Sequence, residues 1–235
     1  VESSGMMDAL RRMKPTCIED IVALVALYRP GPMENIPTYC EVKNGIRPIE
    51  SIHPSIDHIL AETQGIIVYQ EQVMQIAQVM AGYSLGGADL LRRAMGKKNP
   101  EEMAKERPKF IEGCAKTHGV DAKKAGEVFD LLEKFANYGF NKSHAAAYAV
   151  VSYQTGWLKA NHPVEFMAAV MNCDIHLTDK LAVYKREVDR MGLRVVPPCV
   201  NRSLATFSVV RGELVYALGA LKNVGVEAMK AIVEA

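Results

Sequence analysis

Apolar residues recur at every third or fourth position in segment after segment, and this spacing limits the fold more than any other feature of the chain. In "QEQVMQIAQVMAGYS" (residues 70–84), Val73, Ile76, Ala77 and Met80 fall on one helix face. We therefore predict a mainly helical fold. The same spacing predicts further helices over residues 17–28, 33–45, 53–64, 88–95, 121–139, 142–160, 162–173 and 178–192.

Beyond Cys173 the helical spacing gives way to short apolar runs. Such runs are typical of strands, and they cover residues 193–198, 205–210 and 213–218. The Arg211-Gly212 step between the last two predicts a hairpin. A similar run earlier in the chain, "IIVY", predicts a short strand that leads into the helix beginning at residue 70.

The change in texture predicts a domain boundary between residues 172 and 178. We expect a multi-helical domain with one or two short strands over residues 1–172. A small α/β segment then covers residues 173–235, and its last part, "LKNVGVEAMKAIVEA", predicts a glycine turn followed by a helix. The chain opens directly in a helical pattern without an initiating Met, which suggests a piece of a larger protein.

Polar residues mark where the helix at residues 17–28 begins. Thr16 followed by Glu19 predicts a capping box, in which each side chain accepts a hydrogen bond from the other residue's backbone N–H. The helix must end before Pro30, and the loop from Arg29 to Pro32 is expected to be stiff.

The composition is that of a globular protein without a global attraction to anions. Hydrophobic residues make up 49% of the 235 residues, enough for a core, and the formal net charge is +1. Five widely spaced cysteines without a C-x-x-C pair favour a reducing compartment. No signal peptide and no apolar run of about 18 residues is present. We expect a cytoplasmic protein without a membrane partner.

The first cluster that could bind an anion is Arg92, Arg93, Lys97 and Lys98. Asp89 lies four residues before Arg93 and can offset part of its charge, whereas Arg92 is predicted to have no acidic partner. Arginine forks fit pairs of phosphate oxygens. An ordinary solvated helix face is the alternative, and the cluster alone does not decide between the two.

The second cluster is the predicted helix start at Lys142, Ser143 and His144. A helix N-terminus leaves backbone N–H groups unpaired and carries partial positive charge, so cationic and hydroxyl side chains there favour an anion site. Three alanines follow and Tyr148 shares the face of His144, so a flat group can approach closely. In the alternative, Ser143 caps the helix and the alanines admit a neighbouring helix.

Several familiar catalytic patterns are missing from the sequence. Asn141-Lys142-Ser143 is not the end of a phosphate-binding P-loop, because Phe135 and Asn141 occupy the two glycine positions. The chain has no D-x-D pair, no G-x-S-x-G and no metal-binding histidine spacing. We therefore predict phosphate-binding groups without a catalytic or metal site of their own.

Four long stretches together resemble one known family. They are "IVALVALYRPGPM", "GIIVYQEQVMQIAQVMAGYSLGGADLLRRAMGKKNPEEMAKER", "FANYGFNKSHAAAYAVVSYQTGWLKANHPVEFMAAVM" and "RMGLRVVPPCVNRS". In this order they resemble the fingers region of the alpha subunit of bacterial DNA polymerase III, the replicative C-family polymerase. The end of the chain, "VYALGALKNVGVEAMKAIVEA", resembles the helix-hairpin-helix-type segment that follows the fingers.

This resemblance implies a function for both clusters. Fingers of this family close over the incoming deoxynucleoside triphosphate (dNTP) and the nascent base pair, next to primer-template DNA. The resemblance implies that Arg92 and Arg93 meet the triphosphate. It assigns supporting charge to Lys97, Lys98 and Lys142, and the nucleotide-facing side of the helix to Asn141, Ser143, His144 and Tyr148.

The resemblance also implies which parts of the enzyme lie elsewhere. The Mg²⁺-binding aspartates belong to a palm domain that precedes this stretch, and the PHP domain, the OB domain and the clamp-binding motif lie outside it too. No cofactor is therefore expected within this chain. Its expected partners are dNTP, primer-template DNA, the rest of the alpha subunit and the replicase holoenzyme. Alone, the chain is expected to be monomeric and inactive in nucleotidyl transfer.

Two other functions remain open at the level of sequence. A helical protein-interaction module would show no nucleotide- or DNA-dependent chemical shifts around Arg92 or His144. A self-contained nucleotide phosphohydrolase would need carboxylates or histidines that converge in space, and it would show metal-dependent hydrolysis as an isolated chain.

Overall fold

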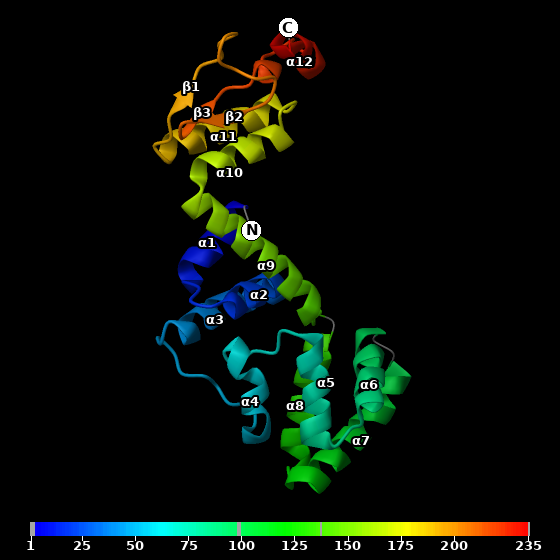
Figure 1. Cartoon of the computed structure of the whole chain (residues 1–235). Helices are drawn as coiled ribbons and strands as arrows, with labels where there is room; N and C mark the ends of the chain where they lie inside the picture. Colours follow the sequence, from blue (N-terminus) through cyan, green and yellow to red (C-terminus); the bar gives the residue numbers. More distant parts are fainter. Residues whose placement is uncertain (1–2, 98–99, 137, 235) are drawn as a thin grey trace. The chain divides into compact units, whose positions relative to one another are not determined.

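The computed structural model describes residues 3–97, 100–136 and 138–234 and divides the chain into two compact units, Val1–Tyr153 and Gln154–Ala235. The described residues are mostly helical, with a three-stranded sheet near the C-terminus (Figure 1). This confirms the predicted fold class. Within the described residues, no helix is both long enough and apolar enough to span a membrane.

The first unit contains two apolar cores. In one, Ala145 and Ala149 of α9 are buried with residues of the first three helices, and in the other Ile76, Phe110 and Phe129 are buried among α5 to α8. The unit contains α1 (Ser4–Met13), α2 (Ile18–Leu27), η1 (Pro32–Asn35), α3 (Ile36–Lys43), η2 (Pro54–Ile56), α4 (Asp57–Leu60), η3 (Ala61–Thr63), α5 (Gln70–Ala81), α6 (Leu85–Lys97), α7 (Pro100–His118), α8 (Ala122–Ala136) and the start of α9 (Lys142–Asn161).

Helix α5 lies beside α6, α7 and α8 and is the centre of the second of these cores (Figure 1). Gly113 of α7 faces the end of α5 so closely that a Cβ atom there would lie 2.2 Å from the carbonyl oxygen of Ala81. Any larger residue would force the two helices apart. The missing side chain at Gly113 therefore lets α7 lie against the C-terminal end of α5.

The short strand predicted over residues 66–69 does not form, and this part of the prediction is wrong. Instead, Tyr69 makes an isolated parallel β-bridge with Phe140. The cause is Gln72, whose Oε1 accepts the backbone N–H groups of Val68 at 2.9 Å and Tyr69 at 3.0 Å. Those two donors are no longer free for a neighbouring strand. The bridge nevertheless holds the segment around Phe140 beside the start of α5.

The helix at residues 17–28 is confirmed, but its cap differs from the predicted one. Asp20 Oδ2 accepts the backbone N–H groups of Thr16 at 2.9 Å and Cys17 at 3.3 Å, so Asp20 replaces Glu19 in the cap. The buried carboxylate of Asp20 also pairs with Lys43 Nζ at 2.7 Å. This contact with α3 favours Asp20 over the neighbouring acid.

The second unit combines helices with the small sheet. Strands β2 and β3 pair antiparallel, which confirms the hairpin, and β1 pairs with β3 in parallel. Met167 and Met171 of α10 share a core with Phe207 and Leu214. The unit contains the end of α9, α10 (Pro163–Cys173), α11 (Thr178–Arg190), β1 (Val195–Val196), β2 (Ser208–Val210), β3 (Glu213–Val215), η4 (Leu218–Ala220) and α12 (Val226–Glu234).

The two compact units divide within α9, upstream of the change in sequence texture. The methionines of α10 pack with the sheet and α11, so this helix belongs to the second unit although its sequence reads like the helices before it. That two independent domains meet between residues 172 and 178 stays a prediction.

Candidate functional site

The two basic clusters lie on different helices and meet at the first turn of α5. Arg92 of α6 donates from Nη1 to Gln70 Oε1 at 3.4 Å. The next residue, Glu71, accepts hydrogen bonds from Asn141 Nδ2 and from the backbone N–H of Lys142, both at 3.1 Å. Two stretches far apart in the sequence are therefore joined through two consecutive residues.

In α6, one carboxylate holds both arginines. Asp89 Oδ1 accepts from Arg92 Nη2 at 2.7 Å and from its Nε at 3.2 Å, while Asp89 Oδ2 lies 2.8 Å from Arg93 Nε. The expectation that Arg92 lacks an acidic partner is wrong, because residues three apart on a helix are neighbours as well as residues four apart. The hydrogen bond from Arg92 lowers the pKa of Asp89, against the effect of desolvation.

The remaining cations of this cluster have different surroundings. Arg93 is 63% exposed at its side chain, whereas Arg92 is 24% exposed. Lys97 is the last residue of α6 and is exposed. Lys98 lies outside the described residues.

The start of α9 is capped by Asn141. Its Oδ1 accepts the backbone N–H of His144 at 2.8 Å, and Glu71 accepts that of Lys142. Contrary to the alternative drawn from the sequence, Ser143 therefore does not cap the helix, and it is exposed. The other half of that alternative is confirmed, because Ala145 is buried against residues of α1 to α3. Because an acid from α5 already lies at this helix start, the local charge is lower than the sequence of α9 indicates.

The side chains of Lys142 and His144 point to different sides of α9. Residues two apart on a helix are rotated by about 200° from each other. Lys142 Nζ lies 2.7 and 2.8 Å from the two carboxylate oxygens of Glu62, and 5.4 Å from the centre of the Tyr69 ring. These residues line a cavity of about 240 Å³ together with Ile18, Glu19, Val22, Ala146 and Val150.

On the other side, three rings form a row along α9. The centre of the His144 ring lies 5.5 Å from that of Phe140 and 4.8 Å from that of Tyr148. The guanidinium carbon of Arg29 lies 4.7 Å from the centre of the Phe140 ring. Tyr148, at the far end, is 58% exposed, so the row ends in an aromatic face open to solvent.

Arg29 is a residue of this site that sequence reasoning missed. It donates from Nε to the carbonyl of Ala26 at 2.9 Å and from Nη2 to the carbonyl of Tyr138. Burial lowers the pKa of Arg29. Gly31 follows with a φ of +96°, and a Cβ atom there would lie 2.6 Å from the Tyr138 ring. The run "RPGP" marks this loop in the sequence, and its glycine leaves room for the Tyr138 ring.

Gln70 and Glu71 were missed as well. The sequence places both in the first turn of a helix, where an acid is common because it stabilises the helix dipole. In the structure these side chains reach residues about seventy positions further along. Gln70 Nε2 lies 3.2 Å from the carbonyl oxygen of Gly139, and Glu71 lies 3.1 Å from Asn141. The sequence does not show these contacts.

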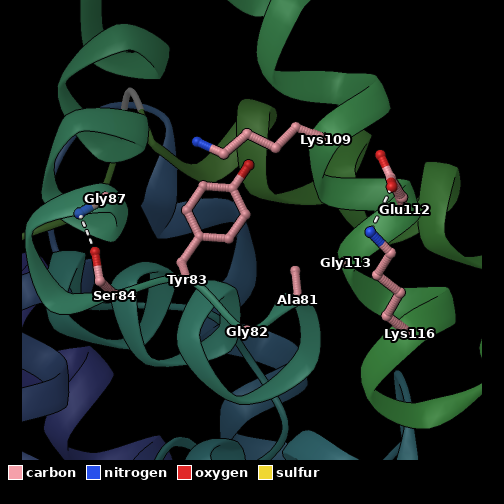
Figure 2. Close-up of a pocket in the computed structure, with 9 residues that line it drawn as sticks. All are labelled: Ala81, Gly82, Tyr83, Ser84, Gly87, Lys109, Glu112, Gly113 and Lys116. Carbon is pink, nitrogen blue, oxygen red and sulfur yellow. Dashed lines mark hydrogen bonds and ion pairs between the residues drawn. The ribbon is translucent and has the colours of Figure 1, made fainter.

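A separate open cleft of about 300 Å³ lies between the end of α5, the start of α6 and α7 (Figure 2). Tyr83 points across it toward Lys109, with Nζ 4.6 Å from the ring centre, and Lys116 pairs with Glu112 at 2.6 Å (Figure 2). Burial and a hydrogen bond to Glu106 raise the pKa of the Tyr83 hydroxyl. The predicted binding residues that the structure describes do not line this cleft.

The described residues do not bring together three or more histidine, cysteine, aspartate or glutamate side chains that could hold a metal ion. The residues around the first turn of α5 instead bring arginines near aromatic rings, and Asp89, Glu62 and Glu71 offset part of the basic charge. Arginine forks can bind an anion, and the exposed ring row can stack against a flat group.

Comparison with known proteins identifies the family. Residues 1–118 match the family described as the bacterial DNA polymerase III alpha subunit finger domain, and residues 192–235 match a helix-hairpin-helix motif. The chain belongs to this polymerase finger-domain family, which confirms the resemblance noted in the sequence.

Close relatives carry the name DNA polymerase III subunit alpha. The protein of Caulobacter vibrioides is 59% identical over 233 residues, covering 99% of this chain and 20% of the relative. That of Escherichia coli strain K12 is 54% identical over 243 residues, covering 100% of this chain and 21% of the relative. The chain spans about a fifth of the length of these curated relatives.

Proposed function

We propose that this chain is the part of a replicative DNA polymerase that binds and positions the incoming dNTP and the nascent base pair. The observation that carries the proposal is the meeting of the two clusters at the first turn of α5. A nucleotide has a polyanionic end and a flat base. The basic cluster can bind the first, and the aromatic row can stack against the second. Family membership of residues 1–118 supports the same function.

The proposed binding group consists of residues from both helices. The exposed Arg93 and Lys97 of α6 would bind phosphate oxygens, and His144 and Tyr148 would face the nucleotide. The full group of residues that bind or position the nucleotide is Arg92, Arg93, Lys97, Lys98, Asn141, Lys142, Ser143, His144 and Tyr148. Lys142 is paired with Glu62 in this structure, so its contribution requires that pair to open.

We place the chemistry of the reaction outside this chain. In the proposed enzyme, a DNA-directed DNA polymerase, Mg²⁺ held by a palm domain would assist attack of the primer 3′ hydroxyl on the α-phosphate. The residues of this chain would orient the triphosphate and neutralise its charge. Alone, the chain is expected not to extend a primer.

The remaining partners follow from the same proposal. The match of residues 192–235 to a helix-hairpin-helix motif supports contact with primer-template DNA. The rest of the alpha subunit and the replicase holoenzyme would complete the enzyme, which we place in the bacterial cytoplasm.

The test is Arg93→Ala in the full-length subunit that contains this chain. Loss of a charge-assisted hydrogen bond, worth about 1.5–3 kcal/mol, should lower kcat/KM for dNTP about ten- to a hundredfold. Affinity for primer-template DNA should change little. Lysine at the same position should restore part of the loss, because it keeps the charge without the planar fork.

A matched control is Arg12→Ala. Arg12 of α1 pairs with Asp8 at 2.7 Å with the same four-residue spacing as Asp89 and Arg93, and its side chain is 67% exposed against 63% for Arg93. This variant should leave incorporation unchanged. An Arg93→Ala enzyme with the kcat/KM of the parent protein would contradict the proposed function.

A further inference from the structure

We propose that the two neighbouring arginines of α6 have different roles, with Arg93 binding phosphate and Arg92 positioning the start of α9 through Gln70. This inference rests on the proposed function and deepens it. It separates residues that are adjacent and chemically identical in the sequence. The separation comes from the contacts that each guanidinium makes.

The guanidinium of Arg92 is held on several sides. Its Nε and Nη2 donate to Asp89 Oδ1 at 3.2 and 2.7 Å, and its Nη1 donates to Gln70 Oε1 at 3.4 Å. The side chain is 24% exposed. A phosphate that took both terminal nitrogens of Arg92 would have to break its contacts with α5 and with Asp89.

Arg93 has the opposite arrangement. Asp89 Oδ2 lies 2.8 Å from its Nε, and the side chain is 63% exposed. The carboxylate therefore holds the inner edge of the guanidinium. Among the described residues, this leaves the outer edge, formed by Nη1 and Nη2, to pair side by side with two oxygens of a phosphate.

Gln70 connects Arg92 to the segment that leads into α9. Its amide oxygen accepts from Arg92, its Nε2 donates to the carbonyl of Gly139 at 3.2 Å, and its backbone N–H donates to the carbonyl of Phe140 at 3.0 Å. A Cβ atom on Gly139 would lie 3.0 Å from Gln70 Cγ, so the two segments are in close contact. An amide is required here because one end accepts and the other donates.

Gln70 contacts the segment at which the aromatic row begins. Phe140 is the first ring of the row that continues through His144 and Tyr148. Arg92 is thus connected to the proposed base-facing residues through one side chain, while Arg93 serves the phosphates directly. Arg92 is a positioning residue.

The experiment is a double-mutant cycle in the full-length subunit, with Arg92→Ala, Gln70→Ala and the double variant. If Arg92 acts through Gln70, each single change should lower kcat/KM for dNTP by on the order of tenfold, equal to about 1.4 kcal/mol. The double variant should lose no more than the more affected single variant, because both break the same connection. If Arg92 binds phosphate itself, the two losses should multiply.

Lysine substitutions give a second readout, which also serves if Arg92→Ala fails to fold. Arg92→Lys should not recover activity over Arg92→Ala, since a single ammonium nitrogen lacks the width of the guanidinium, whose separate nitrogens reach Asp89 and Gln70. If Arg92→Ala does not fold, Gln70→Ala takes its place in this comparison. Arg93→Lys should recover part of the loss, as a phosphate ligand would. Melting curves of all variants establish that they are folded, and Arg12→Ala serves again as the unaffected control.

The outcomes separate the inference from the proposed function. Multiplying losses, partial recovery by Arg92→Lys, or unchanged kcat/KM in either Arg92→Ala or Gln70→Ala would each overturn the role of Arg92, even when Arg93→Ala behaves as expected. An unaffected Arg93→Ala enzyme would overturn the proposed phosphate site itself. Non-multiplying losses together with a sensitive Arg93 support the inference.

Discussion

The basic residues of α6 and those at the start of α9 are neutralised in two different ways. In α6, Asp89 of the same helix pairs with Arg92 and Arg93. At the start of α9, the acids come from distant parts of the chain. Glu71 is 71 residues from Lys142, whose backbone N–H it accepts, and Glu62 is 80 residues from it.

The difference shows which ion pairs can be predicted from sequence alone. A local pair depends on helix geometry and forms whenever the helix forms. A distant pair depends on the fold, and in return it ties two elements together. The contacts of Glu71 therefore fix the start of α9 against α5, whereas Asp89 only orients side chains on its own helix.

The strongest test of this comparison is Glu71→Ala. The change removes the acceptor for Asn141 Nδ2 and for the backbone N–H of Lys142. We expect the free energy of unfolding of the 235-residue chain to fall by about 1–3 kcal/mol, chiefly because the partly buried backbone N–H of Lys142 loses its acceptor. Urea unfolding followed by circular dichroism measures it.

The local counterpart is Glu112→Ala on α7, where Glu112 pairs with Lys116 one turn away at 2.6 Å. Because both side chains are exposed, the free energy of unfolding should change by less than about 0.5 kcal/mol. Equal losses in the two variants would remove the distinction between local and distant acids.

For the pair between Lys142 and Glu62, we expect an effect smaller than that of Glu71→Ala. Their side chains are 41% and 36% exposed, so solvent screens the pair. A double-mutant cycle with Lys142→Ala and Glu62→Ala should give a coupling of about 0.2–1 kcal/mol that shrinks as salt is added. A larger, salt-independent coupling would mean that this pair holds α9 as firmly as Glu71 does.

The smallest effect concerns the titration of Asp89. Its pKa is lowered, chiefly by the hydrogen bond from Arg92, so its ion pairs contribute stability above the unfolded pKa of about 3.9 and lose it as pH falls through the lower folded value. In Arg92→Ala the pKa of Asp89 should rise toward the ordinary value. An NMR titration of the side-chain carboxyl carbon measures this, and an unchanged midpoint would assign the shift to Arg93.

Much of the fold was predictable because helices carry their own signal. The spacing of Val73, Ile76, Ala77 and Met80 predicted α5, and all four side chains are buried. The hairpin of β2 and β3 followed from the turn at Arg211-Gly212. The strand predicted at residues 66–69 failed because the side chain of Gln72 took the backbone donors that a strand needs.

The candidate site was predicted less completely. The sequence selected Arg92, Arg93, His144 and Tyr148 as members of two clusters. It did not indicate that Gln70 and Glu71 join the clusters, since hydrogen bonds between residues this far apart leave no periodic pattern. Arg29 was missed for the same reason, because its contacts lie across the unit at Tyr138 and Phe140.

The sequence by itself determined most of the helices, the hairpin and the chemical types of the proposed binding residues, because periodicity, turn residues and side-chain chemistry act over a few positions. The tertiary structure alone decided that Glu71 lies at the start of α9, that Lys142 turns toward Glu62 and away from the side of His144, and that Arg92 and Arg93 differ in exposure. Those outcomes depend on which segments pack against each other. Packing in turn depends on contacts between residues throughout the first unit, which no short stretch of sequence contains.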